Sequence, residues 1–397
     1  MNYLADKSYL ALKPQSDAFT PVVPTIHVPL VSESIKVNPN VTADRRMKGL
    51  DWKSNDVSKG ERPVSGDLTV WGDVDTLAHL FNMMHLKGST TGNGTDGYTH
   101  PFTNGEGDNY TIEIPRGAYA QRFWGVRGDK LNISFSDNKM MAKLSIKALG
   151  HWYSGTLAVA LTGAGMTELV LKQEYSLTPN KGLVVGDVLV VGGVEVTLSS
   201  VDADGITVGF SSTSVTASVG DAVYLKAQTP SYTFTSEPLT INNTLVGVGA
   251  DDSAADTAAG SVSTAQQVDS LEIEFMNNLL EAKQLGVEGT GRLLNQVREC
   301  QIKMKKMFED PDQHRKWIEE VKQAITVIGR GKFIKSDFST EEKLTIKFYN
   351  VKLTDNGEQL NVGGYIFDEQ TFEALYDTGD AKAFTVDIVN RIAGTTL

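Results

Sequence analysis

The sequence predicts a mainly β fold with flanking helices (β+α), built from two tandem β-sandwich or β-barrel units and a small inserted β domain. Apolar and polar residues alternate with a period of two over much of residues 32–150, which is typical of half-buried antiparallel strands. A similar order of strands and one helix returns after residue 268. Between these stretches, residues 154–230 are rich in small and β-branched residues. Together these patterns define the predicted organisation.

The composition is that of a globular protein with two or three domains. The chain has 397 residues, of which 40% are hydrophobic and 22% charged. The net charge of -12 disfavours tight binding to nucleic-acid phosphates, although an acidic surface would let nucleic acid pass without sticking. Because Cys300 is the single cysteine, no disulfide can form within the chain, which fits folding in a cytosolic compartment. Its alternation with Ile302 and Met304 predicts a small buried hydrophobe.

Residues 1–31 are predicted to be an extended N-terminal arm that lies against a neighbouring molecule. They contain four prolines and little periodicity, and proline removes a backbone donor and favours extended geometry. The first residues lack the cationic and apolar segments of a secretory signal. No stretch approaches 18 consecutive apolar residues, so no membrane span and no membrane partner are expected.

Residues 32–153 are predicted to form the first β unit. Its alternating segments include 110–114, 131–135 and 143–150. One helix is expected over 74–86, because apolar residues recur there at helical spacing. Asp73 or Asp75 is placed to cap the first amides of this helix.

Residues 154–230 are predicted to be the inserted β domain. Valines crowd between paired glycines there, and two Val-Gly-Asp turns each lead into a strand. Residues 247–266 are polar and low in complexity, and they are interpreted as a flexible loop with no core to join.

Residues 231–397 are predicted to form the second β unit. The segment 268–273 precedes Arg298 as 32–37 precedes Arg62, with a constant offset of 236. A long helix is expected over about 311–328, capped by Asp310. The remaining matches are 110–114 with 344–348 and 143–150 with 384–394. We interpret the pattern as one unit present twice; the alternative is a chance likeness of two amphipathic segments.

Sequence motifs for catalysis or cofactor binding are not found. The six histidines show neither H-E-x-x-H nor zinc-finger spacing, and the Gly-x-Gly pairs lack the strand and helix of a phosphate loop. The acidic residues near 73 and 310 are explained as helix caps. We therefore expect no enzyme activity, no catalytic residue, no metal site and no cofactor.

One basic segment, residues 44–62, stands out in this acidic chain. It is expected to form a long loop between two strands. The loop either is simply solvated or contacts an acidic surface of another subunit, with its tryptophan as an anchor. The candidate contact residues are Arg45, Arg46, Lys48, Trp52 and Lys53.

A family resemblance can be stated on two runs of residues. The run "KPQSDAFTPVVPTIHVPLVSESIKVNPN" followed by "RPVSGDLTVWGDVDTLAHLF" resembles the tail tube proteins (major tail proteins) of long-tailed, siphovirus-like bacteriophages, as does "SLEIEFMNNL" with the strand and helix after it. The resemblance covers about 1–150 and 231–397, and the segment 154–230 resembles the decoration domains of such proteins. It implies tail-tube-like units whose sheets join edge to edge around a ring. An extended arm and a long loop would stack these rings.

The resemblance also implies partners and a location. Members with one unit form six-fold rings, so a chain with two units is expected to form stacked trimeric rings, with hexameric rings as the less favoured choice. DNA would pass transiently through an acidic lumen, and tape-measure, tail-terminator and baseplate proteins would be partners in the virion tail, assembled in the host cytoplasm. The alternative function is a β-rich surface adhesin that binds host glycan through the inserted domain.

Overall fold

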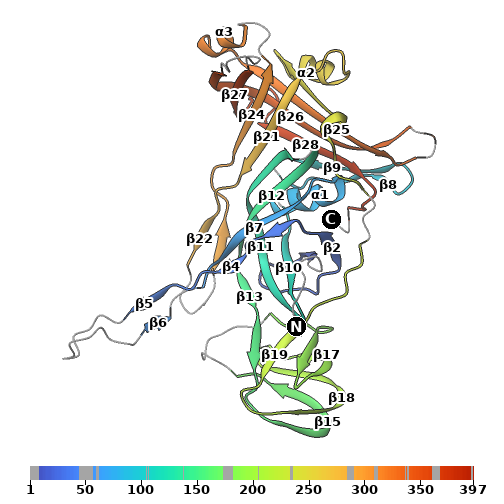
Figure 1. The fold of residues 1–397 in the computed structure, drawn as a ribbon, viewed down its shortest axis with the longest axis vertical. Helices are drawn as coiled ribbons and strands as arrows, with labels where there is room; N and C mark the ends of the chain where they lie inside the picture. The colour runs from blue at the N-terminus through green and yellow to red at the C-terminus, as the bar shows by residue number, and fades with distance from the viewer. Residues whose placement is uncertain are drawn as a thin grey trace, which may run out of the picture.

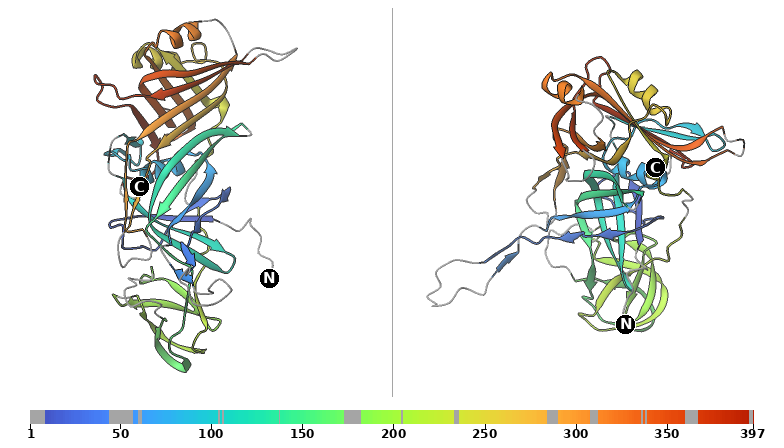
Figure 2. Two further views of the ribbon diagram at one scale, coloured as in Figure 1. Left: turned by 90° about the vertical axis from the view of Figure 1, so that its left-hand side faces the viewer. Right: turned by 45° about the horizontal axis from the view of Figure 1, so that its top comes forward.

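The structure is a computed structural model, and it confirms a mainly β fold built around a large antiparallel sheet. The molecule is elongated, with the second unit at the top of Figure 1, the first in the middle and the insert at the bottom. Figure 2 shows the same three levels from two further sides. The residues described are 9–43, 57–59, 62–103, 105, 107–136, 138–172, 182–203, 205–232, 236–283, 290–307, 312–335, 337, 339–359, 367–394 and 397.

The first unit is a two-layered arrangement in which the long strand β11 takes part in both layers. One half of β11 pairs with β10 and the other half with β12, while β1 continues from β10 and β7 from β12. The elements are β1 (Tyr9–Gln15), β2 (Ile26–Pro29), β3 (Ser32–Glu33), β4 (Lys36–Val37), β5 (Val41–Ala43), β6 (Val57–Lys59), β7 (Val64–Trp71), α1 (Val74–Met83), β8 (Thr91–Asn93), β9 (Gly97–Phe102), β10 (Asn109–Arg116), β11 (Tyr119–Ser136), β12 (Lys139–Ala148) and β13 (Gly150–Trp152).

Helix α1 forms where the helical apolar spacing predicted it. The Asp73 side chain accepts a hydrogen bond from the Thr76 amide at 2.7 Å, which confirms it as the N-cap. The helix is buried along its whole length, and Phe81 packs against Phe275 of the second unit with ring centroids 5.3 Å apart. It therefore lies at the contact between the two units.

The predicted N-terminal arm is wrong for the part of it that the structure describes. Residues 9–15 pair with β10, residues 26–29 pair back onto β1, and Tyr9, Leu10 and Leu12 are fully buried. Pro14 lies within β1 opposite Tyr110, and Pro29 ends β2 opposite Tyr9, so these prolines did not prevent strand pairing. This segment belongs to the chain's own sheet.

The second unit contains the remaining helices. Its long strand β26 pairs with β25 along one half and with β27 along the other, and β9 of the first unit adds to its edge strand β28. The elements are η2 (Ile241–Asn243), β20 (Thr244–Gly249), α2 (Asp252–Ala259), β21 (Val268–Met276), β22 (Leu280–Ala282), β23 (Arg292–Leu294), β24 (Glu299–Met307), α3 (Asp312–Ile318), β25 (Gln323–Phe333), β26 (Glu341–Gln359), β27 (Phe367–Ala374) and β28 (Phe384–Asn390).

Two predictions for this unit are wrong. The long helix over about 311–328 is the short α3 followed by strand β25, and Asp310 and Pro311 lie outside the described residues. Residues 324–329 are buried without interruption, and such a run can be either a buried strand or a buried helix by periodicity alone. The predicted flexible loop over 247–266 contains part of β20 and helix α2, whose Ala255 and Ala259 are fully buried.

Six strands of each unit follow the same pairing order. Numbered along the chain, they are β1, β3/β4, β7, β10, β11 and β12 in the first unit and β20, β21, β24, β25, β26 and β27 in the second. The order across the sheet is β3/β4, β7, β12, β11, β10, β1 in the first unit and β21, β24, β27, β26, β25, β20 in the second, so the two orders correspond strand by strand. In both units a helix lies between the third and fourth of these strands along the chain. Both also interrupt the register at the same two places in the long strand, β11 or β26.

This correspondence supports a tandem repeat, which stays a prediction, and it changes two of the predicted matches. Residues 110–114 lie in β10, which corresponds to β25 rather than to 344–348. Residues 143–148 lie in β12, which corresponds to β27 rather than to 384–390. The two units share one continuous hydrophobic core.

The insert has a separate core. Its strands are β14 (Ser154–Thr156), β15 (Leu161–Val170), β16 (Val188–Val191), β17 (Val194–Val201), β18 (Thr207–Ala217) and β19 (Ala222–Lys226). Their buried side chains form a second cluster with Trp152 and Ala120 of the first unit. In Figure 1 this β domain lies at one end of the molecule.

Candidate assembly interface

One antiparallel sheet runs through both units without a break. Its order is β3/β4, β7, β12, β11, β21, β24, β27, β26. One face packs on the shared core through residues such as Leu68, Leu131 and Ile302, which are all buried. The other face carries polar side chains, as expected for a sheet with one solvated side.

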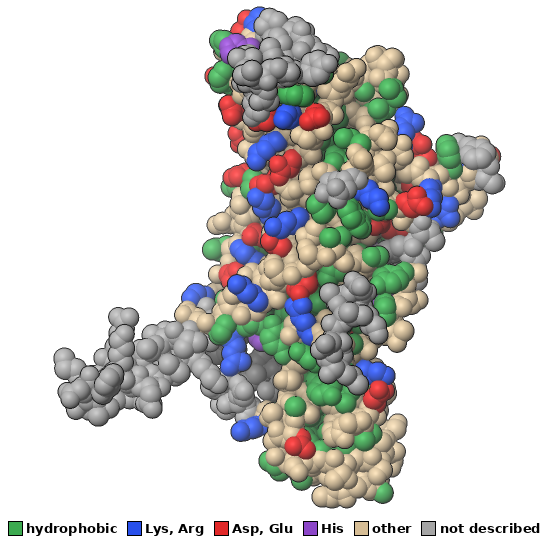
Figure 3. All heavy atoms as spheres, viewed as in Figure 1, with side chains coloured by type: hydrophobic (Ala, Val, Ile, Leu, Met, Phe, Trp, Pro, Cys, Tyr) green, Lys and Arg blue, Asp and Glu red, His purple; other side chains and the backbone are tan. Residues whose placement is uncertain are grey.

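The polar face of this sheet carries both signs of charge. Cross-strand ion pairs include Lys143 with Asp67 at 2.9 Å and Lys130 with Glu274 at 2.7 Å. Figure 3 shows basic and acidic side chains interspersed down the molecule. Pairs on adjacent strands partly cancel each other's field. These strands therefore do not form a uniformly acidic face, although the net charge of the chain is -12.

The join between the two units is a strand pair, β11 with β21. Residues 130–134 lie opposite 272–276 in antiparallel register, and the Lys130–Glu274 ion pair crosses the join on the polar face. On the core face, Leu131 lies opposite Phe275 and Ile133 opposite Ile273, and all four are buried. The join therefore combines backbone pairing, apolar packing and one ion pair.

The two outer edges of this sheet have no such partner among the described residues. Along β26, residues 352–359 pair with β27 on one side only, and β3 and β4 pair with β7 on one side only. The Oδ1 of Asn356 is buried there without a hydrogen-bond partner. At the β3 and β4 edge the Ile35 amide donates to the Glu33 carboxylate at 2.9 Å, a bond that would be exchanged when another strand pairs there. A strand edge without a neighbouring strand is a template for pairing with another chain.

Two hairpins leave the body on the same side as these strands, β5–β6 and β22–β23 (Figure 1). All five predicted contact residues, 45–53, fall in the sequence between β5 and β6 and lie outside the described residues. The second hairpin is anchored to the first unit, since Arg127 donates to the carbonyl of Leu293 at 2.6 Å. It exposes Leu294 and, just beyond it, Val297.

A buried ionic cluster fastens the insert to the first unit. Both terminal nitrogens of Arg122, in β11, donate to the carboxylate of Asp187 of the insert at 2.7 Å. Its Nη2 also donates to Glu113 of β10 at 3.1 Å. The three side chains are at most 1% exposed. Burial raises the pKa of Glu113, which the Arg122 guanidinium opposes. The cluster thus joins the insert to two strands of the first unit through buried, charged hydrogen bonds.

In the part of the chain that the structure describes, no three side chains of His, Cys, Asp or Glu are placed to hold a metal ion. Cys300 is 2% exposed, which confirms its prediction as a buried hydrophobe, and burial raises the pKa of its thiol. Burial lowers the pKa of both His79 and His85 to about 3, so they are neutral structural groups.

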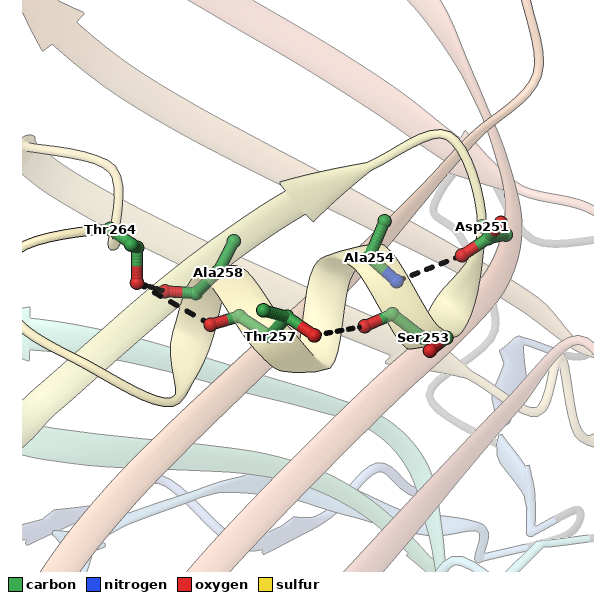
Figure 4. A pocket seen from close by; sticks show the side chains of 6 residues that line it. All are labelled: Asp251, Ser253, Ala254, Thr257, Ala258 and Thr264. Carbon is green, nitrogen blue, oxygen red and sulfur yellow. Dashed lines mark hydrogen bonds between the residues drawn. The ribbon is translucent and has the colours of Figure 1, made fainter.

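A shallow depression lies on helix α2 and is lined by Asp251, Ser253, Ala254, Thr257, Ala258 and Thr264 (Figure 4). Its polar groups already bond within the helix: Asp251 accepts from the Ala254 amide at 2.8 Å, and Thr257 and Thr264 donate to backbone carbonyls. These three side chains therefore cap and close the helix.

The aromatic side chains described in the insert do not line a groove. Phe210 is buried, and Tyr224 packs edge-on against Tyr119 of the first unit with centroids 6.0 Å apart. Separately, none of the helices within the described ranges is both long and apolar enough to cross a membrane.

Sequence reasoning missed the residues that flank the open edges and the ionic cluster. Lys36 and Asp355 are ordinary exposed charges in the sequence, and nothing local marks their strands as edges. Arg122 lies in an alternating strand, and its partners are 9 and 65 residues away. Only the correspondence between the two units could have indicated the edges.

A scan of protein-family models and a search of curated protein sequences each found no match to this chain.

Proposed function

We propose that this chain is a structural protein that assembles into stacked rings and forms a tube, as the tail tube proteins of long-tailed bacteriophages do. The observation that carries the proposal is the sheet that continues from one unit to the next across β11–β21 and then stops at two edges that have no strand partner among the described residues. The two edges correspond to the two sides of the internal join. One edge belongs to β26, the counterpart of β11, and the other belongs to β3 and β4, the counterparts of β21. Sister molecules would continue the sheet.

Ring closure follows from repeating this join. If every join between units turns the sheet by the same angle, the units close into a ring. In a closed ring each edge strand is paired with the next unit, so no strand edge is exposed. Because single-unit tail tube proteins form rings of six, a chain with two such units would need three copies. The polar face of the sheet would line the channel, and its mixture of charges would offer passing DNA no strong attraction.

The insert and the hairpins would have separate tasks in the tube. The insert lies at one end of the elongated chain and, among the described residues, pairs with β11 only at the first residues of that strand, Tyr119 and Ala120, which suits an outward decoration (Figure 2). The β5–β6 hairpin, with its basic residues 44–62, would contact the next ring. Tape-measure, tail-terminator and baseplate proteins would be the other partners in a virion tail.

Negative-stain electron microscopy of the purified protein tests the proposal, together with light scattering after gel filtration. We expect rings or short tubes, and a ring species of about 129 kDa, three times the 43.1 kDa chain. A protein that stays monomeric up to high concentration and shows neither rings nor tubes would contradict the proposal.

A further inference from the structure

The exposed edges carry charges that correspond, position by position, to the ion pair at the internal join. In β11 the register with β12 shifts between Gly128 and Lys130, and in β26 the register with β27 shifts between Leu353 and Asp355. At this shift the residue number in the second unit is that in the first unit plus 225. A second register shift, between β10 and β11 in the first unit and between β25 and β26 in the second, gives the same difference of 225. Lys130 and Asp355 therefore occupy the same place in the two units.

The other partner of the ion pair is fixed by the third strand of each unit. Leu68 and Met304 occupy equivalent places, because each lies opposite the equivalent position of β12 or β27. Across from them lie Glu33 in the first unit and Leu271 in the second. The resulting offset of 238 makes Ile35 equivalent to the buried Ile273, and Lys36 equivalent to Glu274.

The two ends of the sheet thus hold the internal ion pair with its signs exchanged. Inside the chain the long strand supplies a cation, Lys130, and the edge strand an anion, Glu274. At the open edges the long strand supplies an anion, Asp355, and the edge strand a cation, Lys36. Both of these side chains are exposed, and among the described residues neither forms an ion pair. An edge whose charges complement the opposite edge favours association in one register.

We propose that the occupant of each open edge is a second copy of this chain, docked in the register of the internal join and fixed by an ion pair between Asp355 of one copy and Lys36 of the next. In this register Asp355 lies opposite Asn38, Asn356 opposite Val37 and Gly357 opposite Lys36. The proposal rests on the proposed assembly into rings and adds to it the register and the charge pair. The buried Oδ1 of Asn356, which lacks a hydrogen-bond partner among the described residues, then lies at the join.

The charge pair is tested by exchanging it. Lys36→Glu or Asp355→Lys alone places like charges across every join, and each should raise the protein concentration at half assembly roughly ten-fold. The double variant Lys36→Glu/Asp355→Lys gives the outer join the same signs as Lys130 and Glu274, and assembly should return to within about two-fold of the wild-type value. Lys303→Glu and Glu373→Lys make the same charge changes on interior strands of the same face, and they serve as controls for net charge.

The register is tested separately by disulfide trapping. Cα atoms directly opposite each other in an antiparallel pair lie within the range that a disulfide spans. A Cβ at Gly357 would meet no atom nearer than 3.9 Å, and Cys300 is buried, so it does not compete. Under mild oxidation with copper phenanthroline, Lys36→Cys/Gly357→Cys should yield covalently linked copies. Ser34→Cys/Gly357→Cys, which is two residues out of register, should yield far fewer.

The outcomes separate the two proposals. Rings from the wild-type protein, combined with a double variant no better than the single variants and with equal trapping by both cysteine pairs, would overturn the register and leave ring assembly standing. A wild-type protein that never associates would overturn both. Restored assembly in the double variant and selective trapping at Lys36 and Gly357 are the results that we expect.

Discussion

The substitution Asp187→Ala probes how the insert is held. It removes the carboxylate that accepts two hydrogen bonds of 2.7 Å from Arg122, and it leaves a guanidinium that is 1% exposed with Glu113 as its remaining charged partner. Hydrogen bonds to charged groups contribute about 1.5–3 kcal/mol each, and removing one member of a buried ion pair costs about 3–5 kcal/mol. Because Glu113 still compensates part of the charge, we expect a loss near the lower end, about 3 kcal/mol.

Hydrogen exchange read by mass spectrometry measures this loss locally. Peptides from residues 182–230 report the opening of the insert, and peptides from 268–307 report the second unit. Glu195→Ala is the matched control, since it removes a carboxylate that pairs with Lys226 on the insert surface, where the two side chains are 54% and 43% exposed. That exposed pair is worth about 0–1 kcal/mol.

The expected result is faster exchange of the insert peptides in Asp187→Ala, with the second unit unchanged. Equal protection in Asp187→Ala and Glu195→Ala would refute the reasoning, because it would mean that the insert is held by its apolar contacts and not by the buried charges.

Three further predictions concern the core, a helix cap and pH. Phe275→Ala, which removes a ring packed against Phe81 at the contact of the two units, should lower the free energy of unfolding by about 3–5 kcal/mol in urea titrations. Asp251→Ala should cost about 1 kcal/mol through loss of the α2 cap, and Asp251→Asn should cost much less. Burial lowers the pKa of His79 and His85 to about 3 and of His151 to about 4, so their contribution to stability is complete above about pH 6.5 and is lost as the pH falls toward these values. His79→Gln should therefore show a smaller loss of stability than wild type between pH 7 and 4.

Each of these has a clear contrary outcome. Loss of less than about 1 kcal/mol in Phe275→Ala would mean that the units do not depend on their shared core. Equal stability of the two Asp251 variants would exclude the cap as the cause. An unchanged pH slope in His79→Gln would show that this histidine is not held neutral by burial.

The sequence was sufficient for the elements whose signals are local. The β fold follows from alternation with one apolar face, and α1 follows from helical spacing with a capping aspartate, because both signals come from residues close in the chain. Cys300 was placed correctly for the same reason. The alternation of its neighbours indicated a core-facing position.

The errors arose where tertiary contacts decide the structure. The segment 323–328 is buried on successive residues and does not alternate, so only its pairing with β20 and β26 makes it a strand. Helix α2 lacks large apolar residues, yet Ala255 and Ala259 allow it to pack closely on the sheet, where Gly247 would tolerate no larger side chain. Its small residues led to the prediction of a loop. The contact residues predicted in 45–53 remain a prediction.

The candidate interface was harder still, because an edge strand is defined by the pairing that it lacks. Lys36 and Asp355 acquire meaning only when β4 is placed beside β7 and β26 beside β27, and their equivalence to Glu274 and Lys130 depends on two register shifts. Sequence offsets came within two residues of this register, since they matched Ile35 with Leu271 rather than with Ile273. When the register between two strands shifts by two residues, every side chain stays on the same face of the sheet. The alternation of apolar and polar residues therefore cannot distinguish the two registers.

A cryo-electron microscopy map of the assembled protein tests the central claim most directly. We expect three chains in each ring and one uninterrupted sheet, in which residues 355–359 of each copy lie antiparallel to residues 34–38 of the next. Density that leaves these two edges solvent-exposed, or that shows copies meeting through other surfaces, would contradict it.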